Sequence, residues 1–174
     1  KKNQCETKRG EDMFREMRRK KQKLAEEECR AIIERANSGV MGVIGDDGYP
    51  YTVPVNPFLM GNKLYFHSAK AGHKIDAIAK EPKVSFTFID KDDVVSREFT
   101  TYFRSVQVFG KAHIVTDEEE RQKAFRAFCE RYCSDDMDRY DEIMAKEAKA
   151  ALIVCVDIEH ISGKEAMELV KQRG

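Results

Sequence analysis

The chain has 174 residues, of which 31 are Lys or Arg and 31 are Asp or Glu. Its formal net charge of zero provides no basic field for nucleic acid or an anionic membrane, and no apolar stretch approaches the roughly 20 residues needed to cross a bilayer. This length fits one domain with a sizeable core, so we expect a soluble protein that binds a small molecule or another protein.

The cysteines and the N-terminal segment predict a cytoplasmic location. Residues 1–23 form a charged N-terminal arm without the apolar segment of a secretory signal. The cysteine count is odd and the spacing does not indicate a disulfide framework, so free thiols in a reducing compartment are expected. The five are Cys5, Cys29, Cys129, Cys133 and Cys155.

The first half of the chain predicts one helix followed by strands. Apolar residues at helical spacing predict a helix from Leu24 that ends at the helix-stopping run Asn37-Ser38-Gly39. Three strands are then expected, at Val40–Ile44, at Tyr51–Leu59 and at Lys63–His67, with a hairpin turn at Asp46–Gly48. Their short connections predict an antiparallel meander.

The second half predicts a short helix, further strands and more helices. The expected elements are a helix over Gly72–Lys80, a strand over Val84–Ile89, a polar loop over Lys91–Glu98, and a β-rich segment over Phe99–Val115 with a bend or bulge at Gly110. A capping box at Thr116–Glu119 predicts the start of a helix that extends to about Cys133. A second helix is expected near Met137–Lys149, then a buried strand over Ala151–Val156 and a last helix over Gly163–Lys171. About six mostly antiparallel strands predict a small closed or split barrel.

The segment from His67 to Lys74 has the composition of a phosphate site. It lies where a strand gives way to a helix, whose first N–H groups and dipole favour an anion. Ser68 supplies a hydroxyl, Gly72 allows close approach to the backbone, and Lys70 and Lys74 supply cations. The spacing matches neither a Walker A loop nor a dinucleotide fingerprint. The alternative interpretation is a plain strand-to-helix turn with solvated lysines.

Five motifs, in order along the chain, carry a resemblance to a known family. They are Gly45–Tyr51, Leu64–Ala69, Gly72-His73-Lys74, Pro82–Phe86 and Ser105–Ala112. Together they resemble the 5-nitroimidazole antibiotic resistance proteins, within the pyridoxamine 5′-phosphate oxidase-like flavin-binding split barrels. The resemblance extends from Leu24 to about Lys171.

This resemblance implies a six-stranded antiparallel Greek-key split β-barrel over residues 24–174 that forms a homodimer with flavin at the interface. It implies that Ser68 and Lys74 hold the flavin phosphate, with Lys70, Gly72 and His73 in the same turn, and that His67 and Ala69 line the ribityl chain or ring. It further implies backbone contacts from Thr52, Val53, Pro54, Val55 and Asn56 to the isoalloxazine, and a contact from Gln107 of one subunit to the flavin of the other.

The implied activity is that of an FMN-dependent oxidoreductase that reduces nitroimidazoles or a related small acceptor, with FAD as the alternative cofactor. His67 is the candidate catalytic residue, as a proton donor or substrate contact; a structural histidine at a strand end is the alternative. A flavin-binding carrier or sensor and a haem-handling relative are the other candidate functions. The chain has no Trp and lacks the expected pyridoxal phosphate-binding segment near its C-terminus, which disfavours vitamin B6 oxidation. No metal site is predicted, because Cys129 and Cys133 have no second ligand pair.

Overall fold

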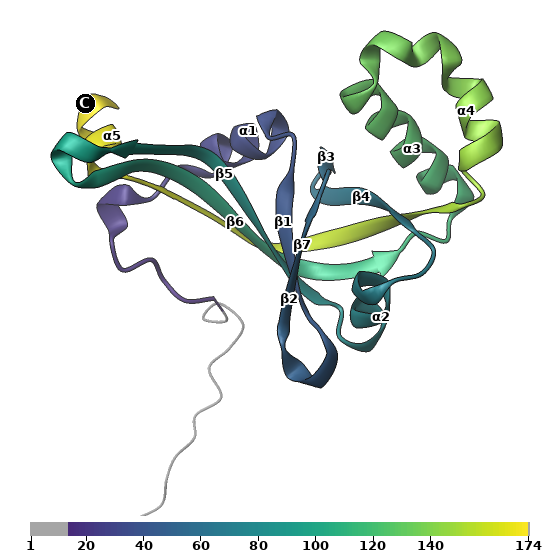
Figure 1. Ribbon diagram of the computed structural model, residues 1–174, viewed down its shortest axis with the longest axis horizontal. Helices are drawn as coiled ribbons and strands as arrows, with labels where there is room; N and C mark the ends of the chain where they lie inside the picture. The colour runs from purple at the N-terminus through teal and green to yellow at the C-terminus, as the bar shows by residue number, and fades with distance from the viewer. Residues whose placement is uncertain (1–13, 174) are drawn as a thin grey trace, which may run out of the picture.

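The computed structural model describes residues 14–173, which form a seven-stranded antiparallel sheet flanked by helices (Figure 1). The strand order is β2-β1-β5-β6-β7-β4-β3. The strands are β1 (Gly39–Ile44), β2 (Pro50–Val55), β3 (Phe58–Met60), β4 (Lys63–Ala69), β5 (Lys83–Val95), β6 (Thr100–Ile114) and β7 (Ala151–Glu165). The mainly β, antiparallel fold class is confirmed, although this part of the chain has one strand more than the six expected.

The additional strand arises because Tyr51–Leu59, predicted as one strand, is divided between the two edges of the sheet. β2 ends at Val55 and β3 begins at Phe58, and Pro57 between them has no N–H to continue a ladder. The predicted antiparallel pairing of consecutive segments is confirmed, since β1 pairs with β2 and β3 with β4. The continuous three-stranded meander is not formed, because the two pairs lie at opposite edges of the sheet. Three peptide steps from Val55 to Phe58 span at most about 11 Å. The sheet must curl until its two edges approach each other at this corner.

Strands β5 and β6 extend beyond the rest of the sheet as a two-stranded arm, drawn at the left of Figure 1 with α5 (Met167–Arg173) near its tip. The ladder continues from the bulge after Ile89 to the pair Val95 and Thr100. The polar loop predicted at Lys91–Glu98 is therefore mostly strand, closed by a 3₁₀ turn at Ser96–Glu98. Its polarity is misleading, because an exposed ribbon tolerates polar residues on both faces.

A cluster of charged side chains lies where this arm leaves the sheet. Arg104 of β6 donates to Asp90 at 3.3 Å and to Glu165 at 3.0 Å. Arg35 donates to the other oxygen of Asp90 at 2.6 Å, and Arg173 meets the second oxygen of Glu165, which is fully buried. The hydrogen bond from Arg35 is the main cause that lowers the pKa of Asp90. We call these five residues the arm-base cluster.

Strand β4 separates two hydrophobic cores. Leu64 and Phe66 point into the main core, which the sheet shares with α1 (Glu26–Arg35) and α2 (His73–Lys80). Tyr65 points the other way, into a smaller core beneath α3 (Glu118–Tyr132), and its hydroxyl donates to Glu120 at 2.8 Å. Both faces of β4 are covered, which explains the nearly continuous apolar character of this strand.

The helices follow the predictions except at some ends. α1 ends before Asn37, as predicted, and α3 begins one residue after Asp117, whose side chain accepts from the N–H of Glu120 at 2.8 Å. The cap is thus Asp117 and not Thr116. A 3₁₀ segment at Ser134–Arg139 leads into α4 (Tyr140–Glu147), and α3 and α4 rise together at one end of the sheet (Figure 1). The last helix starts at Met167 and not at Gly163, because β7 runs on to Glu165.

The predicted bulge at Gly110 is confirmed by a shift of register between Phe109 and Gly110. A Cβ at Gly110 would lie 2.4 Å from the carbonyl oxygen of Asp157, so only glycine fits here. The described part of the predicted N-terminal arm lies against β7, because the ring of Phe14 stacks on His160 at 4.7 Å. Residues 1–13, with Cys5, lie outside the described residues, and the boundary at residue 23 stays a prediction. Between residues 14 and 173, no helix is long and apolar enough to cross a membrane.

Candidate functional site

The predicted phosphate segment occupies the β4–α2 turn, which comprises His67 to Lys74. Because side chains alternate along a strand, Ser68 shares the core face with Phe66, whereas His67 and Ala69 point to the opposite face. The turn therefore presents two different surfaces, one at the start of α2 and one beneath α3.

The hydroxyl of Ser68 is an unusual polar group. The side chain is 4% exposed, and its Oγ has no hydrogen-bond partner in the described chain. Buried hydroxyls normally have a partner, and leaving one unpaired costs about 1–3 kcal/mol. Such an atom is expected where a ligand supplies the missing bond.

α2 begins five residues after Ser68, and its N-terminus is open. Gly72 is the N-cap, with φ of 135°, and no side chain caps the helix. A Cβ added at Gly72 would meet no atom within 4 Å, so the surrounding space is free, although the positive φ still favours glycine. Among the described residues, no carboxylate lies within 4 Å of the ammonium groups of Lys70 and Lys74. Free N–H groups, the helix dipole and two unpaired cations make this turn suited to an anion.

His73 is one of the predicted cofactor-binding residues, and it contacts two other segments. Its ring stacks on Tyr51 at 4.2 Å, and its Nε2 accepts from the N–H of Asp46 at 3.3 Å. Only Nδ1 is left for a ligand. His73 thus ties the beginning of β2 to the beginning of α2, which brings two of the predicted cofactor-binding segments together.

His67 lies on the other surface of the turn. Its ring contacts that of Phe128 of α3, with centroids 4.4 Å apart. Desolvation, and secondly the positive charge of Lys74, lower the pKa of His67 from 6.5. The imidazole is therefore neutral near pH 7, with one nitrogen that donates and one that accepts.

A cavity of about 360 Å³ opens beside His67, between β4 and the helices α3 and α4; we call it the β4–α3 cavity. Most of its lining is apolar, and it includes Ala69, Phe125, Phe128, Ile143, Met144 and Ala150. Sequence reasoning missed the contribution of α3 and α4. The spacing of Phe125 and Phe128 could have indicated an inward helix face, but not that this face meets His67.

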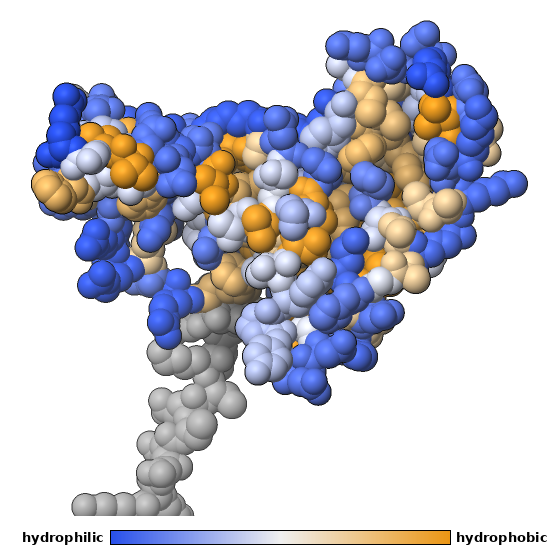
Figure 2. All heavy atoms as spheres, viewed as in Figure 1, coloured by the Kyte–Doolittle hydropathy of each residue, from blue (hydrophilic) through white to orange (hydrophobic). Residues whose placement is uncertain are grey.

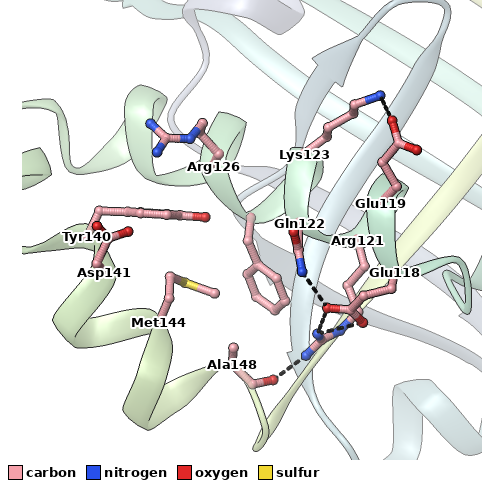
Figure 3. A pocket seen from close by; sticks show the side chains of 11 residues that line it. Glu118, Glu119, Arg121, Gln122, Lys123, Arg126, Tyr140, Asp141, Met144 and Ala148 are labelled. Carbon is pink, nitrogen blue, oxygen red and sulfur yellow. Dashed lines mark hydrogen bonds and ion pairs between the residues drawn. The ribbon is translucent and has the colours of Figure 1, made fainter.

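A larger cavity, of about 560 Å³, lies between α3 and α4 and is drawn in Figure 3. The guanidinium of Arg126 lies over the ring of Tyr140 at 4.6 Å, and Arg121 donates to the carbonyl of Ala148. Arg121 and Arg126 also pair with neighbouring glutamates. None of the predicted cofactor residues lines this space and its arginines are already engaged, so we do not assign a ligand to it.

The remaining predicted residues lie on β2, directly after it, and on β6. Thr52 and Pro54 point to the outer, exposed face of the sheet, whereas Val53 and Val55 pack against the main core. Asn56 donates its side-chain N–H to the carbonyl of Asn37 at 2.8 Å.

Gln107 of β6 is exposed on the same outer face as Thr52, beside Thr87 and Ser162. Thr52 and Phe109 help to line a third, open cavity of about 380 Å³ there. The outer face thus presents Thr52, Pro54 and Gln107 of the predicted residues, whereas Val53 and Val55 face the main core.

A family model described as pyridoxamine 5′-phosphate oxidase matches residues 25–165 of the chain. Among curated proteins no sequence match was found. A candidate 5-nitroimidazole antibiotic resistance protein from Bacteroides thetaiotaomicron is structurally similar, with 22% identity, a TM-score of 0.65, and coverage of 82% of this chain and 86% of that one.

Two further solved structures share the fold. One is a FAD-binding protein from Mesorhizobium loti, with 22% identity, a TM-score of 0.61, and coverage of 83% of this chain and 96% of that one. The other is the FAD and heme binding protein from Mycobacterium smegmatis, with 21% identity, a TM-score of 0.69, and coverage of 88% and 80%.

Proposed function

The chain belongs to the pyridoxamine 5′-phosphate oxidase family, and from this premise we propose that it is a flavin-dependent oxidoreductase whose flavin phosphate binds at the β4–α2 turn. The observation that carries the proposal is the buried, unpartnered Oγ of Ser68, followed five residues later by the uncapped start of α2. A phosphate would accept from this hydroxyl and from the first N–H groups of the helix, and would pair with Lys74.

The fit between these residues and a flavin phosphate is chemical as well as spatial. Lys70 and Lys74 have no carboxylate partner among the described residues, so their charges are available to a doubly charged group. The open space at Gly72 lets phosphate oxygens reach the backbone. FMN, which ends in a phosphate, is the proposed flavin, and FAD is the alternative.

The proposed position of the flavin ring is the outer face of the sheet, covered by a second copy of the chain. Val40, Ile44 and Ile89 leave 40%, 48% and 63% of their surface exposed on this face. Figure 2 shows hydrophobic residues, in orange, in patches from the β5–β6 arm to the middle of the molecule. Exposed apolar area of this kind is typical of a protein interface. In this arrangement, Thr52 contacts the ring and Gln107 reaches the flavin of the partner.

A bound flavin supplies the electron-transfer chemistry, and the chain supplies binding, orientation and proton handling. His67 is the proposed proton donor or substrate contact, because its neutral imidazole lies at the turn and opens into the β4–α3 cavity. Nitroimidazoles or related small acceptors are the proposed substrates.

The decisive experiment records the visible spectrum of the purified protein and identifies the released cofactor by mass. We expect absorption near the flavin maxima and one FMN per chain. Replacing Lys74 by Ala should deplete the flavin, whereas replacing Lys80 by Ala, at the other end of α2, should not. A colourless protein that takes up neither FMN nor FAD would contradict the proposal.

Turnover separates an enzyme from a flavin carrier. The flavin-loaded protein, reduced chemically without oxygen, should be reoxidised by a nitroimidazole faster than free reduced flavin is, and the amine or a partly reduced product should form. Reoxidation at the same rate as free reduced flavin would mean that the protein binds flavin but does not catalyse the reduction. Light scattering at micromolar concentration should give the mass of a dimer, and a monomer would contradict the shared interface.

A further inference from the structure

We propose that Cys129 and Cys133, which we call the thiol pair, bind a trivalent arsenical through both sulfur atoms. Cys133 is the residue that ends α3, and the 3₁₀ segment that leads to α4 follows it. The inference goes beyond the proposed function and does not rest on it, because neither cysteine is among the proposed flavin-binding residues.

Both thiols of the pair are free and can be reached from solvent. Cys133 is exposed, and the half-buried Cys129 lines the open β4–α3 cavity. The other two cysteines of the described chain, Cys29 and Cys155, are 2% and 0% exposed. Burial is also the main cause that raises the pKa of Cys29 to about 11. The thiol pair therefore holds the most accessible sulfur atoms among the cysteines that the structure describes.

The spacing of the pair suits one bridging atom. Residues four apart on a helix have Cβ atoms about 5–6 Å apart. This helical spacing extends to the second cysteine, because the N–H of Cys133 donates to the carbonyl of Cys129 at 2.7 Å. A disulfide needs Cβ atoms roughly 3.5–4.5 Å apart. The gap is thus too wide for a direct S–S bond without movement, whereas a single atom bonded to both sulfurs can span it.

The number of available ligands favours arsenic over the metals that thiolates commonly bind. Zinc usually takes four protein ligands in a closed site. Within residues 14–173, no group of three or more His, Cys, Asp or Glu side chains is placed to hold a metal ion. Trivalent arsenic forms three bonds, and an organoarsenical brings one of them as its own carbon substituent. Two sulfurs then complete the coordination of the arsenic.

The binding step is a condensation in which arsenic stays trivalent. An arsenical with two hydroxyl groups forms two As–S bonds and loses two As–O bonds, and each hydroxyl leaves as water with the proton of one thiol. Desolvation, followed by the negative charge of Cys133, raises the pKa of Cys129. Cys129 is therefore a protonated thiol near pH 7, which is the form that the condensation consumes. The influence of one sulfur on the other also indicates that they lie close together, since such interactions weaken with distance.

A bound arsenical changes one wall of the β4–α3 cavity. Cys129 lines this cavity together with Phe128, whose ring contacts that of His67 with centroids 4.4 Å apart. Binding at Cys129 therefore alters the surroundings of the Phe128 ring, and the Cε1–H resonance of His67 should shift in NMR spectra. This resonance reports on the site independently of the arsenic chemistry.

The test titrates the reduced protein with phenylarsine oxide, whose hydrated form carries two hydroxyl groups on arsenic. We expect one phenylarsenic adduct per chain by intact mass, stable to 2-mercaptoethanol and reversed by 1,2-ethanedithiol, because only a dithiol replaces both As–S bonds within one molecule. The adduct should also protect Cys133 of the unaltered protein from alkylation by iodoacetamide. Full alkylation of Cys133 in the adduct would overturn the inference, and so would an adduct mapped to another cysteine.

Variants test whether both thiols and their spacing are needed. Cys129→Ser and Cys133→Ser should each weaken binding about 100-fold or more, because the second bond then no longer forms within one molecule. The matched control combines Cys133→Ser with Lys123→Cys, which keeps five cysteines but places the second thiol six residues before Cys129 at an exposed position of α3. It should bind as weakly as Cys133→Ser, whereas Cys5→Ser should bind as tightly as the parent. Tight binding by Cys133→Ser or by the matched control, or weak binding by Cys5→Ser, would overturn the inference.

Discussion

The arm-base cluster and the β4–α2 turn are both rich in charge, but they differ in how that charge is satisfied. In the arm-base cluster each of the five side chains meets an opposite charge, and Glu165 is fully buried. In the turn, the described residues offer no carboxylate partner to Lys70 and Lys74 and no hydrogen-bond partner to the hydroxyl of Ser68.

The difference indicates two separate roles for polar groups in one small fold. A closed network fixes geometry, and here it joins α1, the bulge of β5, β6, β7 and α5 at one point. An open set of donors favours an anion from outside. Substitutions in the two regions should therefore change different properties, namely stability in the first and ligand binding in the second.

The largest effect is expected in the arm-base cluster. Replacing Arg104 by Ala leaves the buried Glu165 and Asp90 without their shared partner, and breaking a buried pair costs about 3–5 kcal/mol. We expect the free energy of unfolding in urea to fall by about 3 kcal/mol. Arg97→Ala at the exposed tip of the arm is the control and should change it by less than about 0.5 kcal/mol. Equal losses in both variants would mean that the cluster is not a closed network.

The next largest effect is expected for Lys74→Ala in the β4–α2 turn, which should change FMN binding and not stability. Lys74→Ala removes a charge-assisted contact to phosphate, which corresponds to about 10- to 100-fold weaker FMN binding. The free energy of unfolding of the flavin-free protein should not fall, because no native ion pair is lost. Titration of apoprotein with FMN measures the first quantity and urea denaturation the second. A stability loss similar to that of Arg104→Ala would erase the distinction between the regions.

These contrasts also show what the sequence can and cannot predict. The turn is predictable because a strand, a serine, a glycine and two lysines follow one another within eight residues. The arm-base cluster is not, because Arg35, Asp90 and Glu165 are far apart in the chain and only the sheet brings them together. The same holds for the β4–α3 cavity, where Phe128 approaches His67 across more than 60 residues.

The errors in the predicted fold also arise where local sequence does not determine the structure. The predicted β7 is too short because its second half, from Asp157, is no longer a continuous apolar run. The prolines near Val55 and Phe58 can predict that the strand is interrupted there. They cannot predict that β2 and β3 lie at opposite edges of the sheet, because that depends on how all the strands are arranged.

A smaller effect, with opposite signs for binding and stability, is expected for Ser68→Ala. Loss of one hydrogen bond to the ionised phosphate should weaken FMN binding about 10-fold, since a hydrogen bond to a charged group contributes about 1.5 kcal/mol or more. The flavin-free protein should be as stable as the parent or more stable, because an unpartnered buried hydroxyl is removed. Differential scanning calorimetry with and without FMN measures both. Destabilisation of the flavin-free form would show that the hydroxyl already has a structural partner.

The smallest effect is expected in the titration of His67. Its pKa should lie below 6.5, and Lys74→Ala should raise it while leaving it below 6.5, because desolvation is the larger cause. Since the unfolded chain binds this proton more readily than the folded one, the contribution of His67 to stability should decline as pH falls below about 6.5. The Cε1–H resonance in NMR reports the pKa. An unchanged value in Lys74→Ala would place the ammonium away from the ring.

The corner at Pro57 has a consequence for how the protein can associate. One edge strand of the sheet is β3, which has only three residues. The other edge strand is β2, in which Pro50 and Pro54 have no N–H to donate. Short edge strands and prolines hinder pairing with strands of other molecules, which is a usual first step in fibril formation. We therefore expect contacts between molecules to form across the broad surfaces of the fold, and concentrated solutions to resist the growth of amyloid.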